Sequence, residues 1–145
     1  MNSPPVNRDL ASLHPLFLHP FQAWLRAAEH AVQHVEFRVT ETRRTLARQE
    51  WLYAQGRTPP HHRSPPVTWT LGSRHRWGLA ADIAMIRKST GEAIWEVSSW
   101  AWLYRTVPPE PFGLRTLIPR EYVHLEMRYA DEAIAEAAAL GLERT

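Results

Sequence analysis

Asp82 lies inside an apolar run, residues 79–86, that carries no other charged side chain. The run is short enough for a buried β-strand. A carboxylate in such surroundings is costly unless it is paired or bound to a metal. The segment therefore constrains the fold, because the strand must bring Asp82 next to groups that satisfy it.

Two histidines are candidate partners for this carboxylate. His75 comes just before the apolar run, and His124 lies in a strand-like segment, residues 121–127. With Asp82 they would supply two imidazole nitrogens and one carboxylate oxygen, three protein ligands for zinc. A fourth position left open for water is typical of a catalytic rather than a structural zinc site.

The chain has no cysteine among its 145 residues. Disulfides, thiolate nucleophiles and cysteine-type zinc sites are therefore excluded, and a metal site must use His, Asp and Glu. We interpret the other six of the eight histidines as ordinary residues: His14, His19, His30, His34, His61 and His62. A zinc-binding HExxH pattern is absent, since Ala31 follows His30.

The segment over residues 121–127 also carries two carboxylates near His124. In an alternating strand, Tyr122, His124 and Glu126 share one face and Glu121 starts the other. Glu121 could still reach the metal if it sits at a bent entrance to the strand.

Hydrophobic periodicity predicts the remaining elements. We expect an irregular arm over residues 1–20, which holds four prolines, and loops over residues 57–66 and 108–119. Helices are predicted from residue 21 to 35 and over 45–55, 91–107 and 131–140. Strands are predicted over 36–40 and 79–86, with a short extended piece at 67–70. For the third helix, the candidate core contacts are Ile94, Trp95, Val97 and Trp102.

This length fits one compact domain, and the pattern predicts an α+β fold with a small, mostly antiparallel sheet and packed helices. A net charge of +2 is too small to indicate a nucleic-acid-binding face. No apolar run approaches the roughly 18 residues of a membrane span. The first residues do not resemble a secretory signal peptide, so we expect synthesis in the cytoplasm and export by outside help.

Three ordered segments carry a family resemblance. They are Ser73-x-His75-x-x-Gly78-x-Ala80-x-Asp82, then Glu121-x-x-His124, and before both the arginine-containing stretch of residues 44–58 with its Leu-Tyr-x-Gln-Gly-Arg-Thr sequence. Together they resemble the D-Ala-D-Ala carboxypeptidase and L-alanyl-D-glutamate endopeptidase family of zinc peptidases, which includes many phage endolysins. The resemblance covers roughly residues 36–127 and implies the hedgehog/D,D-peptidase-like fold, with residues 21–145 as the catalytic domain.

The resemblance also implies roles for individual residues. His75, Asp82 and His124 match the zinc ligands, and Glu121 matches the general base. Arg44 matches an arginine that holds substrate or the developing oxyanion, and Ser73 matches a hydroxyl on the substrate side of the site. There are two departures. Arg43 stands where an aromatic residue is common, so Arg43 and Arg44 could exchange roles, and residues 113–119 replace a tryptophan- and glycine-rich segment.

The function implied is hydrolysis of the peptidoglycan stem peptide with a Zn²⁺ cofactor. We expect an L-alanyl-D-glutamate endopeptidase of phage lysis, acting as a monomer on the cell wall. One alternative is a D,D-carboxypeptidase that releases terminal D-alanine. A second, from another class, is a zinc-binding domain without activity, although Glu121 argues against it because a purely structural site needs no base.

Overall fold

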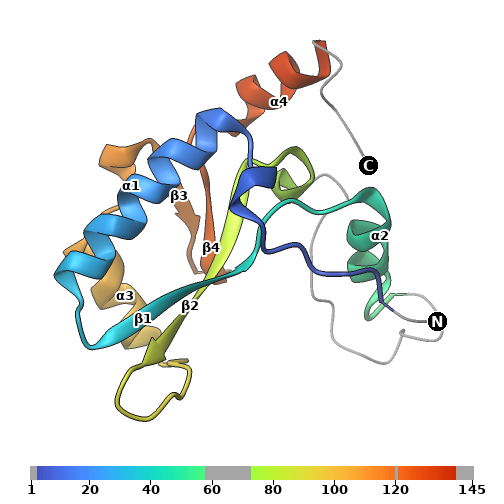
Figure 1. The fold of residues 1–145 in the computed structure, drawn as a ribbon. Helices are drawn as coiled ribbons and strands as arrows, with labels where there is room; N and C mark the ends of the chain where they lie inside the picture. Colours follow the sequence, from blue (N-terminus) through green and yellow to red (C-terminus); the bar gives the residue numbers. More distant parts are fainter. Residues whose placement is uncertain (1–2, 58–72, 120, 140–145) are drawn as a thin grey trace.

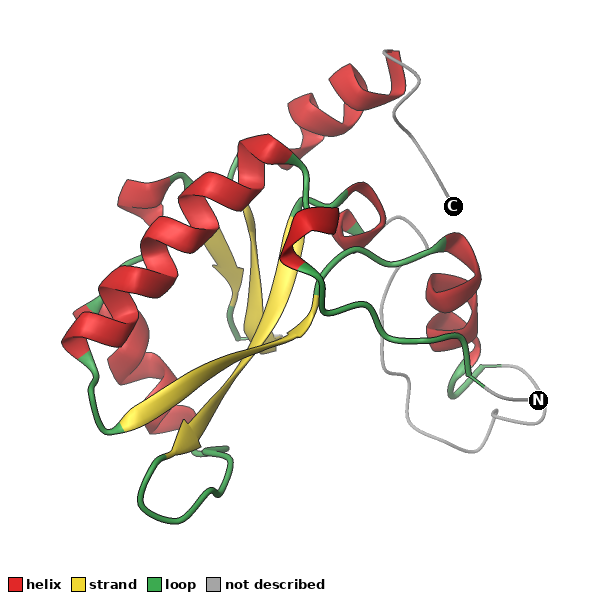
Figure 2. Cartoon of the chain, in the orientation of Figure 1, coloured by secondary structure: helices red, strands yellow, loops and turns green. Residues whose placement is uncertain are grey.

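The computed structural model describes residues 3–57, 73–119 and 121–139 of the chain. Its sheet has four strands in the order β1 (Val35–Glu41), β2 (Ala80–Arg87), β4 (Glu121–Met127) and β3 (Leu114–Leu117). All neighbouring strands are antiparallel. The helices are α1 (Pro15–Ala31), α2 (Leu46–Ala54), α3 (Val97–Thr106) and α4 (Ala130–Ala139), with three short 3₁₀ turns (Figures 1 and 2). The predicted α+β class with a small antiparallel sheet is confirmed.

The two faces of the sheet differ in what covers them. Alternate residues of β2, namely Ala81, Ile83 and Met85, are buried in the core, where they join residues of α1 and α3. Both helices lie on this side of the sheet (Figure 1). The intervening residues Asp82 and Ala84 point to the other side, which we call the open face.

Helix α1 begins six residues earlier than the sequence pattern predicts. Pro15 is at its first turn, and the Nδ1 atom of His14 accepts a hydrogen bond from the backbone N–H of Leu16 at 3.1 Å. The rings of Phe17 and Phe21 stack in the core with centroids 5.1 Å apart. The predicted irregular arm is therefore wrong from Pro15 onward. Proline is tolerated at a first helical turn, and burial of the phenylalanines outweighs the hydrogen bond that Pro20 cannot make.

The third predicted helix is shorter than expected. The residues before α3 are extended, and Ala93 forms an antiparallel bridge with Ile86 of β2. The core contact predicted for Ile94 is confirmed. It is wrong for Trp95, Val97 and Trp102, which are 72%, 55% and 44% exposed. The core aromatic residues of α3 are instead Trp100 and Tyr104, which follow the helix period from a later start.

The loop predicted over residues 108–119 contains regular structure. A 3₁₀ turn (Glu110–Phe112) is followed by strand β3, which pairs with β4. The four residues Leu114–Leu117 have their two apolar side chains at the ends and two polar ones between them. This short pattern does not alternate, so the sequence does not indicate a strand. Pairing along β4 supplies the stabilisation that the local pattern lacks.

Other elements agree with the prediction to within about two residues. Thr45 caps α2 by accepting a hydrogen bond from the N–H of Arg48 at 3.1 Å, and Gly56 follows the helix with a φ of 78°. The predicted loop beyond Arg57 and the extended piece at 67–70 lie outside the described residues. Among the helices of the described segments, none has the length and apolar character needed to cross a bilayer.

Candidate metal centre

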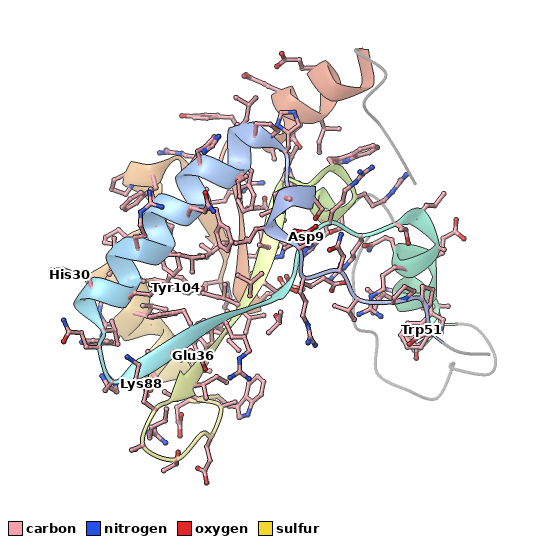
Figure 3. The ribbon with its side chains drawn as sticks, in the orientation of Figure 1. Asp9, His30, Glu36, Trp51, Lys88 and Tyr104 are labelled. Carbon is pink, nitrogen blue, oxygen red and sulfur yellow. The ribbon has the colours of Figure 1, made fainter. Side chains whose placement is uncertain are left out.

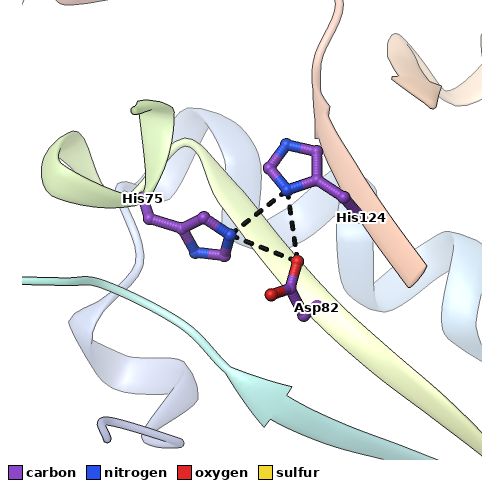
Figure 4. A group of neighbouring side chains, drawn as sticks. All are labelled: His75, Asp82 and His124. Carbon is purple, nitrogen blue, oxygen red and sulfur yellow. Dashed lines mark hydrogen bonds and ion pairs between the residues drawn. The ribbon is translucent and has the colours of Figure 1, made fainter. Parts of the chain in front are cut away.

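Three side chains from three elements converge over the two central strands, on the open face of the sheet. His75 comes from the 3₁₀ turn Arg74–Trp77, Asp82 from β2 and His124 from β4 (Figure 4). Asp82 and His124 are register partners across two antiparallel strands, so their side chains emerge side by side. Within the described segments, these residues are the group of His and acidic side chains that could hold a metal ion.

The spacing of the three inward-facing atoms fits a tetrahedral metal ion. Asp82 Oδ1 lies 3.2 Å from His75 Nε2 and 3.1 Å from His124 Nδ1, and the two ring nitrogens are 3.2 Å apart. Ligand bonds of about 2.0–2.1 Å at tetrahedral angles place neighbouring ligand atoms about 3.3 Å apart. Atoms this close together share a proton when the centre is empty or a cation when it is filled, and zinc favours this set of two imidazoles and one carboxylate.

The polypeptide fixes which nitrogen of His75 faces the centre. Its Nδ1–H donates to the carbonyl oxygen of Thr42 at 2.7 Å, which leaves Nε2 as the ligand atom. Ser73 caps the short turn by accepting a hydrogen bond from the N–H of His75 at 3.2 Å. Gly78 ends the turn with a φ of 72°, and a Cβ there would lie 2.7 Å from the backbone nitrogen of His14. Ser73 and Gly78 therefore shape the turn that presents His75.

His124 is oriented through its other ring nitrogen. Its Nε2–H donates to Glu126 Oε1 at 2.9 Å, and the second oxygen of Glu126 accepts from Arg115 at 2.7 Å. Burial lowers the pKa of His124, but hydrogen bonds to Asp82 and Glu126 outweigh it and raise the pKa to about 9. In the metal-free centre the imidazole therefore holds a proton where a metal would bind.

Asp82 presents its second oxygen to a buried arginine network. Arg44 lies 3.7 Å from Asp82 Oδ2, forms a 2.9 Å ion pair with Glu41, and donates to Gln49 at 3.1 Å. Arg48 pairs with Glu41 at 3.0 Å. Burial opposes ionisation of Asp82, but the neighbouring histidines outweigh it and lower its pKa. The carboxylate is thus held in the charged form that a metal ligand requires.

Glu121 lies at the entrance of β4, and its role as the general base stays a prediction. A register shift between Thr116 and Leu117 of β3 bends this end of the pair and places Leu117 opposite Glu121. One carboxylate oxygen of Glu121 is 3.7 Å from His124 Nδ1, and its side chain is 33% exposed. A carboxylate open to solvent thus faces the same nitrogen as the candidate metal.

Arg43 and Arg44 differ in which groups their side chains contact. The Arg44 side chain is only 11% exposed and its guanidinium is turned toward Asp82 and Glu41. Arg43 instead donates from Nε to the carbonyl oxygen of Arg76 at 3.3 Å. Of these two, Arg44 is the residue brought to the centre. A substrate-binding role for Arg44 or Ser73 remains a prediction.

Other residues of the centre were not found from the sequence. Glu41, Gln49 and Arg115 are brought in by strand pairing and helix docking. Glu41 and Gln49 are distinguished by their burial, and Arg115 by its ion pair with Glu126 at 2.7 Å. Conversely, the histidines that the sequence set aside, His14, His19, His30 and His34, lie outside the centre. His61 and His62 are outside the described residues.

Comparison of the sequence with known protein families and with curated proteins finds no match. Solved structures do match. The Serratia marcescens L-Ala D-Glu endopeptidase ChiX is 22% identical with a TM-score of 0.60, over 85% of this chain and 86% of that one. VanYB in complex with D-alanine-D-alanine is 18% identical with a TM-score of 0.55, over 97% and 85% of the two chains. The LdcB LD-carboxypeptidase is 16% identical with a TM-score of 0.56, over 92% and 70%. The chain therefore has the fold of these peptidases, as the resemblance implied.

Proposed function

We propose that the protein is a zinc-dependent peptidoglycan hydrolase that cleaves the stem peptide, specifically an L-alanyl-D-glutamate endopeptidase of phage lysis. The observation that carries the proposal is the convergence of His75 Nε2, Asp82 Oδ1 and His124 Nδ1 at tetrahedral ligand spacing, with Glu121 beside them. All four residues belong to one chain, so this set needs no residue from a second copy, and action as a monomer is part of the proposal.

The three ligand residues would hold zinc, which when bound acts as a Lewis acid and makes water a better nucleophile at neutral pH. Thr42 and Glu126 keep the two imidazoles in the tautomers that direct lone pairs inward. Arg44 and the histidines keep Asp82 ionised. The protein thus supplies a preorganised, negatively charged site for a divalent cation.

Glu121 would act as the general base. Its carboxylate is near the centre yet a third exposed, so it can accept a proton from the attacking water and deliver it to the leaving amine. Arg44 would add positive charge near the scissile carbonyl and stabilise the oxyanion. A zinc domain without activity has no use for an exposed carboxylate at this position, which favours the hydrolase over that alternative.

Similarity to ChiX supports the endopeptidase over the carboxypeptidase. The TM-score with that L-Ala D-Glu endopeptidase is 0.60, against 0.55 with VanYB, and the sequence identity is 22% against 18%. VanYB, which was solved with D-alanine-D-alanine, also shares the fold, so the D,D-carboxypeptidase remains the alternative that the experiment must exclude.

The experiment is digestion of purified peptidoglycan by the zinc-loaded protein, followed by mass spectrometry of the products. We expect new N-terminal D-glutamate and new C-terminal L-alanine, and lysis of permeabilised bacteria. Glu121→Gln protein, compared at equal zinc content, controls for a contaminating hydrolase. Release of free D-alanine would instead identify a carboxypeptidase, and no cleavage despite bound zinc would identify a non-catalytic domain.

A further inference from the structure

Trp95 is the most exposed of the large apolar side chains in the described residues, at 72%. The sequence predicted a core contact here, so its exposure calls for an explanation. The preceding residue, Ile94, is buried, and the following residue, Glu96, has extended backbone angles before α3 begins. An extended segment alternates its side chains, which directs Trp95 away from the core.

The pairing of this segment with β2 places Trp95 on the open face. Ala93 bridges Ile86, and the N–H of Ile94 donates to the carbonyl of Met85 at 2.9 Å. Continued one residue beyond these contacts, this antiparallel register would set Trp95 opposite Ala84. Because side chains at paired positions emerge on the same face, Trp95 shares the face of Ala84 and therefore of Asp82.

Trp95 also lies on the same edge of β2 as His124. Strand β1 occupies one edge of β2 along its length, so β4 and the segment containing Ala93 both lie on the other edge. His124 is opposite Asp82, and Trp95 is opposite the next same-face position. Same-face positions along a strand are about 7 Å apart, so this register would place the backbone of Trp95 about one such step from that of His124.

Arg38 is a second exposed side chain on the face to which this register assigns Trp95. Arg38 of β1 is the register partner of Ala84 across the edge of β2 that faces away from Trp95, and it points to the same face of the sheet. Two interstrand spacings separate Arg38 from Trp95 by about 10 Å, with the small Ala84 side chain between them. Arg38 is exposed and ion-paired with Glu36 at 2.7 Å. An indole face suits the apolar C–H face of a pyranose, and a guanidinium can donate to its polar rim.

We propose that Trp95 contacts the glycan strand, its indole ring stacking on the muramic acid ring that carries the scissile peptide. The inference rests on the proposed endopeptidase activity. In that substrate, the lactyl group and L-alanine separate the scissile carbonyl from the sugar by two backbone-length units, about 7 Å. A terminal D-alanyl bond lies about five such units, or about 17 Å, from the sugar. The short distance expected between Trp95 and the metal centre thus agrees with cleavage of the L-Ala–D-Glu bond, which is the one near the sugar.

The test compares two substrates with the same scissile bond, N-acetylmuramyl-L-Ala-γ-D-Glu-Lys and N-acetyl-L-Ala-γ-D-Glu-Lys. The ratio of their kcat/KM values measures the contribution of the sugar. We expect the parent protein to favour the muramyl peptide about three- to tenfold, and Trp95→Ala to bring the ratio close to one. Trp95→Phe should retain part of the preference. Trp102→Ala is the matched control, because Trp102 is also exposed but lines a cavity with the core-face residue Met85.

A binding measurement accompanies the rates. In the Glu121→Gln background, calorimetry should show weaker binding of the muramyl peptide when Trp95→Ala is added, with no such change for Trp102→Ala. If the parent cleaves both peptides but prefers neither, or if Trp95→Ala lowers both rates equally, the glycan contact is overturned and the proposed function stands. If the parent cleaves neither peptide, the proposed function and this inference fail together.

Discussion

The side chain of Glu126 accepts a hydrogen bond from Nε2 of His124 at 2.9 Å while its other oxygen pairs with Arg115 at 2.7 Å. His124 and Glu126 lie two residues apart on one face of β4. The candidate ligand and the carboxylate that orients it therefore belong to one strand. Burial raises the pKa of Glu126, but His124 and the arginines outweigh it and lower the pKa, so the acceptor is a carboxylate.

The hydrogen bond from His124 makes Glu126 a positioning residue for the metal. Glu126→Ala should weaken zinc affinity about 10- to 100-fold, because His124 loses the partner that fixes its ring and tautomer. Glu126→Gln should weaken it less, since the amide oxygen can still accept the hydrogen bond. Competition with a chelator of known affinity measures the change, and Glu92→Gln, at an exposed turn, is the control. Equal affinities for all three variants and the parent would contradict the role.

One zinc ion per chain is expected from the three ligand residues. His75→Ala should remove it, because two ligands hold zinc poorly, whereas His34→Ala should keep it, since His34 is exposed and outside the centre. Elemental analysis after gel filtration gives the zinc content. A metal-free parent, or a His75→Ala protein with full zinc content, would show that these residues are not the ligands.

The two neighbouring arginines should differ in their effect on catalysis. Arg44 approaches Asp82, whereas Arg43 is bonded to a backbone carbonyl. Arg44→Ala should therefore lose much more kcat/KM than Arg43→Ala, by roughly 2–4 kcal/mol of transition-state stabilisation. Steady-state kinetics at matched zinc content, with thermal unfolding to verify the fold, distinguish the two. A larger loss for Arg43→Ala would reverse the assignment.

The sequence was most informative where local pattern and chemistry coincide. The apolar run around Asp82 predicted a strand, and β2 is that strand. Glu41 and Gln49 could not be recognised in the same way. Glu41 reaches the metal centre through the pairing of β1 with β2, which sets it opposite Asp82, and the irregularity between Val39 and Glu41 changes the register there. Such long-range pairing leaves no trace in a local pattern.

For Trp95 the local pattern was misleading, because it predicted a core contact that the folded chain does not make. Its apolar character fitted a helical core position, but the extended residues before α3 shift the period and turn the indole outward. The predicted start of α1 is wrong because Pro15 and Pro20 indicate an irregular segment, whereas the burial of Phe17 and Phe21 stabilises a helix there. In both cases tertiary packing decided against the local propensity.

Stability should fall at acid pH through Glu41. Burial raises the pKa of Glu41, but Arg44 and Arg48 outweigh it and lower the pKa below the value in the unfolded chain. A group with a lowered folded-state pKa stabilises the protein above the unfolded pKa of about 4.3, and this contribution is lost as pH falls toward the folded-state pKa. The parent should thus lose more unfolding free energy than Glu41→Gln between pH 7 and acid pH. Urea titrations of the metal-free proteins measure both, and parallel pH profiles would contradict the prediction.

Glu121→Gln separates the hydrolase from an inert zinc domain. The substitution keeps the size of the side chain and removes the basic oxygen that lies 3.7 Å from His124 Nδ1. Because Glu121 is not one of the three ligands, zinc content and melting temperature should stay those of the parent. The rate of stem-peptide cleavage should fall about 10²- to 10⁴-fold, the usual contribution of a general base. Glu96→Gln, at an exposed position before α3, provides the matched control. A Glu121→Gln protein that cleaves as fast as the parent would assign the base to another group.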